Sequence, residues 1–153
     1  MSVAFRRESD EEHLEPKFDI PIPPGPNLVT ARGLALLEAK VAELEAGLPA
    51  LTDEDARKAR QRDLRYWRTR LATAELTEAK PGEVVGFGCR VDLRVKGKAR
   101  TIEIVGYDEA DPATGKLAFT APLCRAVMGS EVGDVVDFGG TDRAVEVLAI
   151  TRT

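Results

Sequence analysis

Apolar residues recur with the period of an α-helix in two successive stretches of the chain, between residues 30 and 78. In the first stretch they are spaced by four, three and four residues, which places them on one side of a helix: Leu37, Val41, Leu44 and Leu48. In the second they follow the spacing of a coiled coil: Leu64, Trp67, Leu71 and Ala74. Two helices with matching apolar stripes and a short break between them are expected to pair antiparallel. The sequence therefore predicts a helical hairpin.

The residues around these stretches predict where the two helices begin and end. Thr30 is well suited to cap the first helix, whose expected range is 31–46. Gly47 and Pro49 are expected to end it, and Thr52 to cap the second helix.

After Lys80-Pro81-Gly82 the apolar period changes from that of a helix to two. Val91, Leu93 and Val95 alternate with polar residues, and Gly97 allows a turn into a second strand at 101–105. Further short strands are expected at 116–119, 135–138 and 144–150, with a short helix from Pro122 to Met128. We therefore predict an α+β protein, with a helical hairpin at 28–79 and an antiparallel sheet domain with one short helix at 80–153.

Residues 1–27 are charged at first and then rich in proline, a composition typical of a flexible tail. The alternative is that Phe18, Ile20 and Ile22, which alternate with other residues, lie along a surface of the folded part.

Composition and net charge narrow the range of possible functions. The net charge of -4 over 153 residues argues against a protein that coats nucleic acid. No apolar run could span a bilayer and the N-terminus has no signal-peptide core, so we expect a cytoplasmic protein. We also expect it to be a monomer. Cys89 and Cys124 have apolar neighbours and are expected to be buried free thiols. With His13 as the single histidine, the sequence excludes a catalytic triad and a histidine-based zinc site.

An acidic group, Asp53, Glu54 and Asp55, follows the break between the helices. One interpretation is that these carboxylates only stabilise the first turn of the second helix through its dipole. The other is that they reach a partner from the end of a rigid hairpin and bind a cation there, with oxygen ligands of the kind that Mg²⁺ prefers.

The second helix is strongly basic, with seven cations against one anion, Asp63, over fourteen residues: Arg57, Lys58, Arg60, Arg62, Arg65, Arg68 and Arg70. These charges could form a solvated face, but their excess over the available anions favours contact with phosphates. Trp67 falls on the apolar stripe and is expected in the core, whereas Tyr66 is the candidate for a solvent-facing ring.

Several motifs together resemble the Gre family of transcript elongation factors. They are Leu28-Val29-Thr30 with Gly33 and Leu37, Val85-Gly86-Phe87-Gly88, the run Ile104 to Asp111, Ala121-Pro122-Leu123-Cys124-Arg125-Ala126, and Gly129 with Gly133-Asp134. They occur in the family's order and spacing, and the resemblance covers nearly all of residues 28–150.

The resemblance implies a C-terminal domain of FKBP-like fold that docks on the rim of the secondary channel of bacterial RNA polymerase. The docking loop corresponds to Thr120, Ala121, Pro122 and Leu123, with Arg125 beside it. The hairpin would enter the channel, where Asp53, Glu54 and Asp55 help to hold a Mg²⁺ ion shared with the polymerase while a backtracked RNA 3′ end is hydrolysed. The RNA-contacting residues would be Arg57, Arg60, Arg65 and Arg68. The chain is then no enzyme and has no cofactor or metal of its own.

The sequence departs from the family pattern at three points, and these limit how far the family's functional residues can be assigned to this chain. Glu54 aligns with the glutamate of the family's tip, but the tip aspartate falls against Leu51 or Thr52 unless Asp53 replaces it. Each helix is two to three turns shorter, roughly 10–15 Å less reach. Thr120 stands where some members have an acidic residue.

Three rival functions follow from these departures and from the fold. One is a secondary-channel regulator without cleavage activity, because a short-hairpin relative in the same superfamily docks without stimulating cleavage. A second is an FKBP-like prolyl isomerase, which would need an aromatic pocket built from Phe87, Tyr107, Phe119 and Phe138. The third is an interaction module unrelated to transcription.

Overall fold

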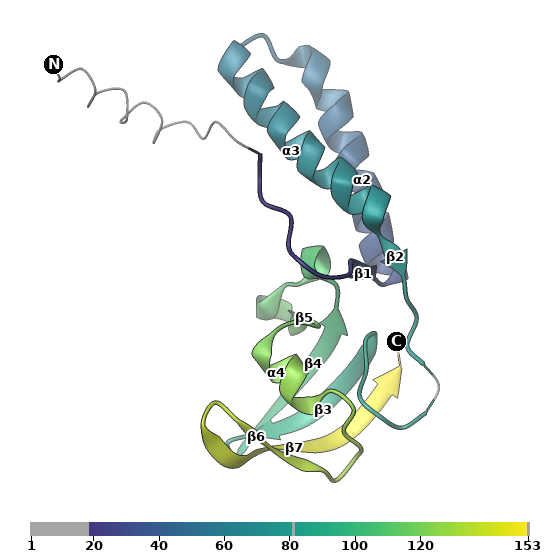
Figure 1. Ribbon diagram of the computed structural model, residues 1–153, viewed down its shortest axis with the longest axis vertical. Helices are drawn as coiled ribbons and strands as arrows, with labels where there is room; N and C mark the ends of the chain where they lie inside the picture. The colour runs from purple at the N-terminus through teal and green to yellow at the C-terminus, as the bar shows by residue number, and fades with distance from the viewer. Residues whose placement is uncertain (1–18, 81, 153) are drawn as a thin grey trace, which may run out of the picture.

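The computed structural model describes residues 19–80 and 82–152 and has two parts, a pair of helices and a β-sheet. The helix pair projects away from the sheet, so that the connection between the helices is the point farthest from it (Figure 1). The α+β class is confirmed.

The helix pair consists of α2 (Ala31–Gly47), a 3-10 turn η1 (Leu48–Ala50) and α3 (Glu54–Thr73). The two helices pack through Val41, Leu44 and Leu64, with Trp67 and Leu71 partly buried against them. The predicted apolar stripes therefore face each other. At 17 and 20 residues the helices are about 25 and 30 Å long.

The helix caps agree with prediction at one end and differ at the other. Thr30 caps α2, with its Oγ1 accepting a hydrogen bond from the amide of Gly33 at 3.0 Å. The predicted Thr52 cap of α3 is wrong. Because η1 and an extended Leu51 delay the start of the helix, Asp53 is the capping residue, and its Oδ2 accepts from the amide of Ala56 at 2.9 Å.

The sheet has five strands in the order β5-β4-β3-β7-β6. Their bounds are β3 Cys89–Val95, β4 Lys98–Val105, β5 Lys116–Ala118, β6 Val135–Phe138 and β7 Thr141–Arg152. The predicted turn at Gly97 joins β3 to β4, with positive φ at Lys96 and Gly97.

The prediction of a wholly antiparallel sheet is wrong at one edge, because β4 and β5 pair parallel. Between them the chain passes through two 3-10 turns, η2 (Tyr107–Glu109) and η3 (Pro112–Thr114), and returns before β5 begins. The sheet is therefore mixed.

One short helix, α4 (Pro122–Val127), covers the sheet (Figure 1). Its Leu123, Cys124 and Val127 join the strands' apolar residues in the main core. Cys89 and Cys124 are buried free thiols, as predicted, and burial raises the pKa of Cys124 to about 11.

The two parts meet at the base of the helix pair, where β1 (Leu28–Val29) pairs parallel with β2 (Glu75–Leu76). Residues 19–27 run beside α3 to this point (Figure 1). Ile20 and Ile22 line a groove with Tyr66 and Thr69, as the alternative interpretation expects, and Asn27 is buried. Phe18 and the rest of residues 1–18 lie outside the described residues.

Candidate functional site

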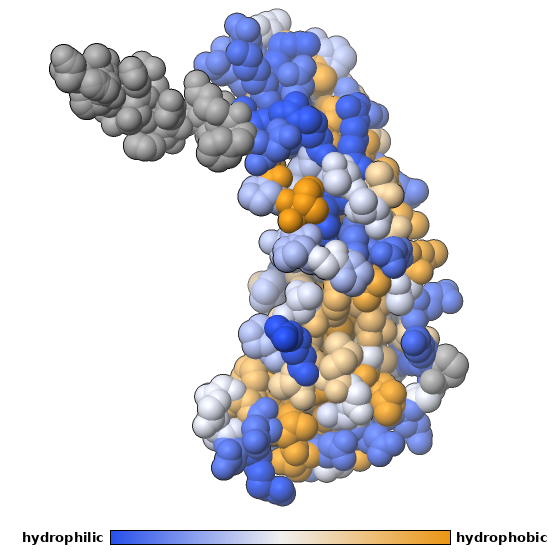
Figure 2. Space-filling view, viewed as in Figure 1, coloured by the Kyte–Doolittle hydropathy of each residue, from blue (hydrophilic) through white to orange (hydrophobic). Residues whose placement is uncertain are grey.

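The three candidate carboxylates lie at the far end of the helix pair, and all are exposed. Their surroundings differ. Asp53 is occupied as the helix cap, whereas the side chain of Glu54 is 80% exposed and lies 3.7 Å from Lys58, one turn further along α3. Figure 2 shows hydrophilic residues gathered around this end of the molecule. Glu54 and Asp55 are therefore the carboxylates most available to a partner.

These carboxylates do not form a metal site on their own. Within residues 19–80 and 82–152, no group of three or more metal-ligating side chains is placed so that it could hold an ion. Mg²⁺, however, is commonly held by one or two carboxylates together with water and ligands from elsewhere. The tip therefore suits a metal ion that is held mainly by a partner. It does not suit an ion that this chain would have to bind alone.

The candidate RNA-contacting arginines have partners within the chain, which the sequence interpretation did not foresee. Arg57 donates to the carbonyl oxygens of Leu48 and Leu51, and so holds the turn between the helices. Arg60 packs against Gly47. The excess of cations within residues 57–70 stands as counted, but anions from outside this stretch pair with some of them, and two of these anions bind candidate RNA-contacting arginines.

Those two partners are Asp19 and Glu45. Arg65 pairs with Asp19 at 2.7 Å, and Arg68 pairs with Glu45 of α2 at 2.7 Å. Both arginine side chains are about half exposed, so they line the outside of the helix pair while neutralised by neighbours.

Tyr66 is buried, and its predicted role as a solvent-facing ring is wrong. Only 9% of the residue is exposed, because this part of α3 packs against η2, and the phenol donates to Asp108 Oδ1 at 2.6 Å. Burial is the main cause of a raised pKa for the Tyr66 phenol, and this hydrogen bond adds to it. Trp67 packs edge-to-face on Tyr66 and contacts the helix-pair core, as expected.

The candidate docking loop is mostly on the surface. Thr120, Pro122 and Arg125 are exposed and Ala121 is half-buried. Leu123 is the exception: it is 4% exposed and belongs to the main core, so the assignment of its side chain to a docking surface is wrong. The amphipathic pattern of α4 turns Leu123 inward.

A small groove of about 140 Å³ lies beside this loop. Its walls are Pro23, Pro24, Pro26, Arg70, Tyr107, Phe119 and Thr120. The proline-rich segment thus packs next to the candidate docking loop, an adjacency that composition could not reveal.

The four aromatic residues considered for a prolyl isomerase pocket have separate surroundings. Phe87 and Phe119 pack edge-to-face at 5.6 Å against the main core, and Phe138 also packs against that core. Tyr107 is half exposed at the base of the helix pair. Of the four, only Tyr107 and Phe119 share the small groove beside the loop, and the chain's own prolines line it with them.

One buried polar cluster was missed by sequence reasoning and lies between α3 and η2. Arg70 donates from Nε to Asp108 Oδ2 at 2.6 Å, with 3% and 6% of the two side chains exposed. Arg70 also donates to Asn27 Oδ1 at 2.8 Å, and Asn27 Nδ2 donates to the Arg70 carbonyl at 2.7 Å. One signal was present: Arg70 follows Tyr66 by four residues, which places both on the same helix face.

A second polar cluster joins the start of α2 to the sheet. Arg32 pairs with Glu103 of β4 and lies 3.3 Å from Glu109, whose Oε1 accepts a hydrogen bond from the Thr30 hydroxyl at 2.5 Å. Burial opposes ionisation of Glu103, but Arg32 and Arg90 outweigh it and lower the pKa of Glu103.

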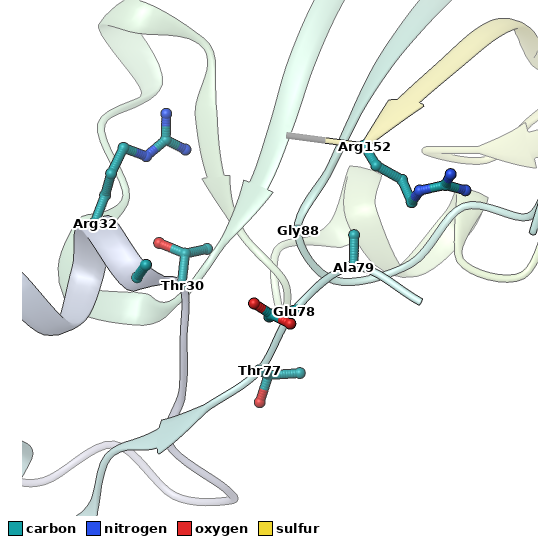
Figure 3. A pocket seen from close by; sticks show the side chains of 8 residues that line it. Thr30, Arg32, Thr77, Glu78, Ala79, Gly88 and Arg152 are labelled. Atoms are coloured by element: carbon teal, nitrogen blue, oxygen red, sulfur yellow. The ribbon is translucent and has the colours of Figure 1, made fainter. Parts of the chain in front are cut away.

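A cleft of about 410 Å³ lies at this junction (Figure 3). Thr30, the cap of α2, and Arg32 in its first turn line one side, Thr77 to Ala79 line it from the segment after β2, and Arg152 from the end of β7. The Arg32 guanidinium is already paired with Glu103 and Glu109, so its charge is occupied within the chain. The cleft is therefore explained by the way in which the helix pair joins the sheet.

No helix in the described part of the chain combines the length and the apolar character needed to cross a membrane.

Comparison with known proteins gives concordant results. Residues 80–152 match the family model described as the C-terminal part of transcription elongation factor GreA/GreB. The transcription elongation factor GreA of Desulfovibrio desulfuricans is 30% identical over 132 residues, covering 71% of this chain and 82% of that protein. GreA of Sinorhizobium medicae is 32% identical over 115 residues, and the match covers 71% of this chain and 69% of that protein.

Other matches are shorter or looser. GreA of Thioalkalivibrio sulfidiphilus is 41% identical over 80 residues, and the chain spans about half of that relative's length (51%). Among solved structures, GreA factor homolog 1 of Thermus thermophilus is 22% identical with a TM-score of 0.39, covering 82% of this chain and 99% of that one. The transcription elongation factor GreA/GreB from Nitrosomonas europaea is 22% identical with a TM-score of 0.40, and the match covers 84% of this chain and 99% of that one. Superpositions this loose carry no argument about this chain.

Proposed function

Because this chain belongs to the Gre family of transcription elongation factors, we propose that it binds bacterial RNA polymerase in the cytoplasm and inserts its helix pair into the secondary channel. The sheet domain, which we take to be FKBP-like, would dock on the channel rim. The tip would then stimulate the polymerase's own hydrolysis of a backtracked RNA 3′ end.

The observation that carries this proposal is the position of the acidic tip. Glu54 and Asp55 are exposed at the end of the helix pair farthest from the sheet, with Glu54 80% exposed. Carboxylates at the end of a rigid projection can be delivered into a narrow channel while the wider sheet domain stays outside.

The tip residues would act by orienting groups that the polymerase already holds. A Mg²⁺ ion bound mainly by the polymerase would supply the Lewis acid and activate the attacking water. Glu54 and Asp55 would accept hydrogen bonds from that water or bind the ion directly, whereas Asp53 is engaged at the helix cap. This chain then contributes carboxylates and no complete active site.

Docking would use the exposed part of the loop before and within α4. The exposed residues Thr120, Pro122 and Arg125 offer a hydroxyl, an apolar ring and a cation. The buried Leu123 would support the loop from behind.

Contact with RNA would require Arg65 and Arg68 to exchange their partners. Exposed ion pairs such as Arg65–Asp19 and Arg68–Glu45 contribute only about 0–1 kcal/mol each, so a phosphate could replace either carboxylate at little cost. Arg57 is a poorer candidate, because it holds the backbone of the turn.

A second candidate function, channel occupancy without cleavage, is favoured by the length of the helices. With 17 and 20 residues, the pair extends about 30 Å at most. Carboxylates that stop several ångströms from the ion would block the channel without contributing a ligand, since Mg–O contacts are about 2.1 Å.

A polymerase complex stalled on a backtracked template would separate these functions. We expect the wild-type protein to shorten the RNA and Glu54→Gln to slow the reaction about tenfold or more, the usual cost of removing a partner of a bound metal. Glu38→Gln, a change of the same kind on the exposed face of α2, should have no effect.

The other outcomes are equally informative. Binding to polymerase without RNA shortening would support occupancy alone. Absence of binding would contradict both functions and favour the unrelated interaction module.

A further inference from the structure

We propose that Arg70 and Asp108 are positioning residues, whose buried ion pair fixes the angle at which the helix pair leaves the sheet and so aims the acidic tip. Its consequence for RNA cleavage rests on the proposed function. The geometric claim itself does not.

The pair lies where three segments of the chain meet. Arg70 comes from the last turn of α3, Asp108 from η2 and Asn27 from the segment before β1. Arg70 binds Asp108 and Asn27 with two different nitrogens, at 2.6 and 2.8 Å. A planar guanidinium that holds two partners fixes their relative directions as well as their separation.

Asp108 is bound from two sides as well. Its Oδ2 accepts from Arg70 and its Oδ1 accepts from the Tyr66 phenol, at 2.6 Å each. Tyr66 and Arg70 lie one turn apart on α3, so the carboxylate binds two side chains of the same helix. Two such contacts resist rotation of α3 about its own axis.

Burial makes this arrangement selective for one orientation. The two charged side chains are 3% and 6% exposed, so a rotation that separated them would leave two buried charges without partners. In a medium of low dielectric that state is strongly disfavoured. An exposed pair such as Arg68–Glu45 imposes no such penalty, because water replaces the lost partner.

A second attachment on the other helix prevents the pair from swivelling about the first. At the start of α2, Arg32 pairs with Glu103 and Thr30 donates to Glu109. Between the two attachments, Gly106 passes so close to Leu28 that a Cβ at this position would overlap its carbonyl oxygen. Both helices are therefore fastened to the end of β4 and to η2, which follows it.

The length of the helices makes the angle at the base important. Arg70 follows Glu54 by 16 residues on α3, which places the tip about 24 Å from Arg70, so a rotation of about 10° at the base would move the tip by about 4 Å. Metal–ligand distances tolerate only about 0.2 Å. A tip that contributes a ligand must therefore be aimed from the base.

The geometric claim can be tested on the chain alone with spin labels at Ala50→Cys and Asp142→Cys, one in the turn between the helices and one at the far end of the sheet. Both sites are exposed, and the native thiols are buried and should not take the label. Pulsed electron paramagnetic resonance then measures the distribution of distances between the labels.

We expect one narrow distribution in the otherwise wild-type protein and at least a twofold broader one in Arg70→Met. Arg68→Met, the same substitution at an exposed ion pair of the same helix, should leave the distribution narrow. If Arg70→Met loses helical circular dichroism, the decision passes to Asp108→Asn, which removes the charge without changing the shape. A folded variant of either kind with the wild-type distribution overturns the proposal.

The link to function has its own readout. Because the docking loop is unchanged, Arg70→Met should bind polymerase within about twofold of the wild type while its maximal cleavage rate falls about tenfold. Equal losses in affinity and maximal rate would overturn the positioning role. If the wild-type protein stimulates no cleavage, the proposed cleavage function fails and the distance measurement still decides the geometric claim.

Discussion

At the scale of single residues, Tyr66 has the most unusual environment. Its ring is buried between α3 and η2, and its phenol donates to a carboxylate that also binds Arg70. Both burial and the nearby negative charge disfavour the phenolate, which is why the pKa of Tyr66 is raised.

This raised pKa predicts a loss of stability in alkaline solution. The folded protein holds the Tyr66 proton more tightly than the unfolded chain, whose tyrosines have a pKa of about 10. The stabilising contribution is complete below about pH 10 and is lost as the pH rises toward the folded-state pKa. Above pH 10 the free energy of unfolding should fall by up to about 1.4 kcal/mol per pH unit from this group.

Urea unfolding between pH 8 and pH 11 would measure this loss. Tyr66→Phe should be less stable by about 2 kcal/mol at neutral pH, because a hydrogen bond to a charged group is removed, and should show a shallower decline above pH 10. Identical alkaline profiles for Tyr66→Phe and wild type would contradict the assignment.

At the scale of elements, the start of α3 places a capping carboxylate next to two exposed ones. Asp53 ends the turn and caps the helix, whereas Glu54 and Asp55 occupy the first helical positions and point their charge outward. Capping therefore falls to Asp53, whereas Glu54 and Asp55 lie in the first turn, where the helix dipole favours them, and remain exposed for the proposed contact with an ion.

Substitutions at Asp53 can separate capping from charge. Asp53→Ala should lower the free energy of unfolding by about 1 kcal/mol, since the Ala56 amide loses its acceptor. Asp53→Asn keeps a capping side chain and should cost only a few tenths of a kcal/mol. Urea unfolding followed by circular dichroism would measure both.

The same two variants also test the tip. If Asp53 only caps the helix, Asp53→Asn should retain wild-type stimulation of RNA cleavage. A large loss of activity with unchanged stability would instead place Asp53 among the residues that act on the ion.

At the scale of the whole molecule, the two parts differ in how much core they contain. The sheet domain has a core of thirteen buried residues, whereas the helix pair buries Val41, Leu44 and Leu64 against each other. Isolated helices of this length are marginal in water without further packing. The helix pair is therefore expected to depend on its attachment to the sheet.

Separate fragments would measure this dependence. A fragment of residues 79–153 should fold alone and unfold cooperatively in urea, because its core is complete within it. A fragment of residues 19–78 should show much less helical circular dichroism than the same residues contribute in the full chain. Equal helicity in the isolated helix pair would show that the attachment aims the helices without stabilising them.

The sequence by itself determined the parts of this protein that depend on local periodicity. These parts are the apolar stripes of α2 and α3, the alternation in β3, the Thr30 cap and the buried cysteines. Each of them follows from the position of a residue within its own element. Periodicity within one element needs no knowledge of its neighbours. The acidic tip is predictable for the same reason.

The tertiary structure alone decided which charges are paired and which rings are buried. The partners of Arg65, Arg68 and Arg70 lie 23 to 46 residues away in the sequence, so no count of local charges could find them. The burial of Tyr66 and the parallel pairing of β5 likewise depend on how η2 returns the chain. Charges and hydrogen bonds act through space between distant segments, and only the folded chain brings those segments together.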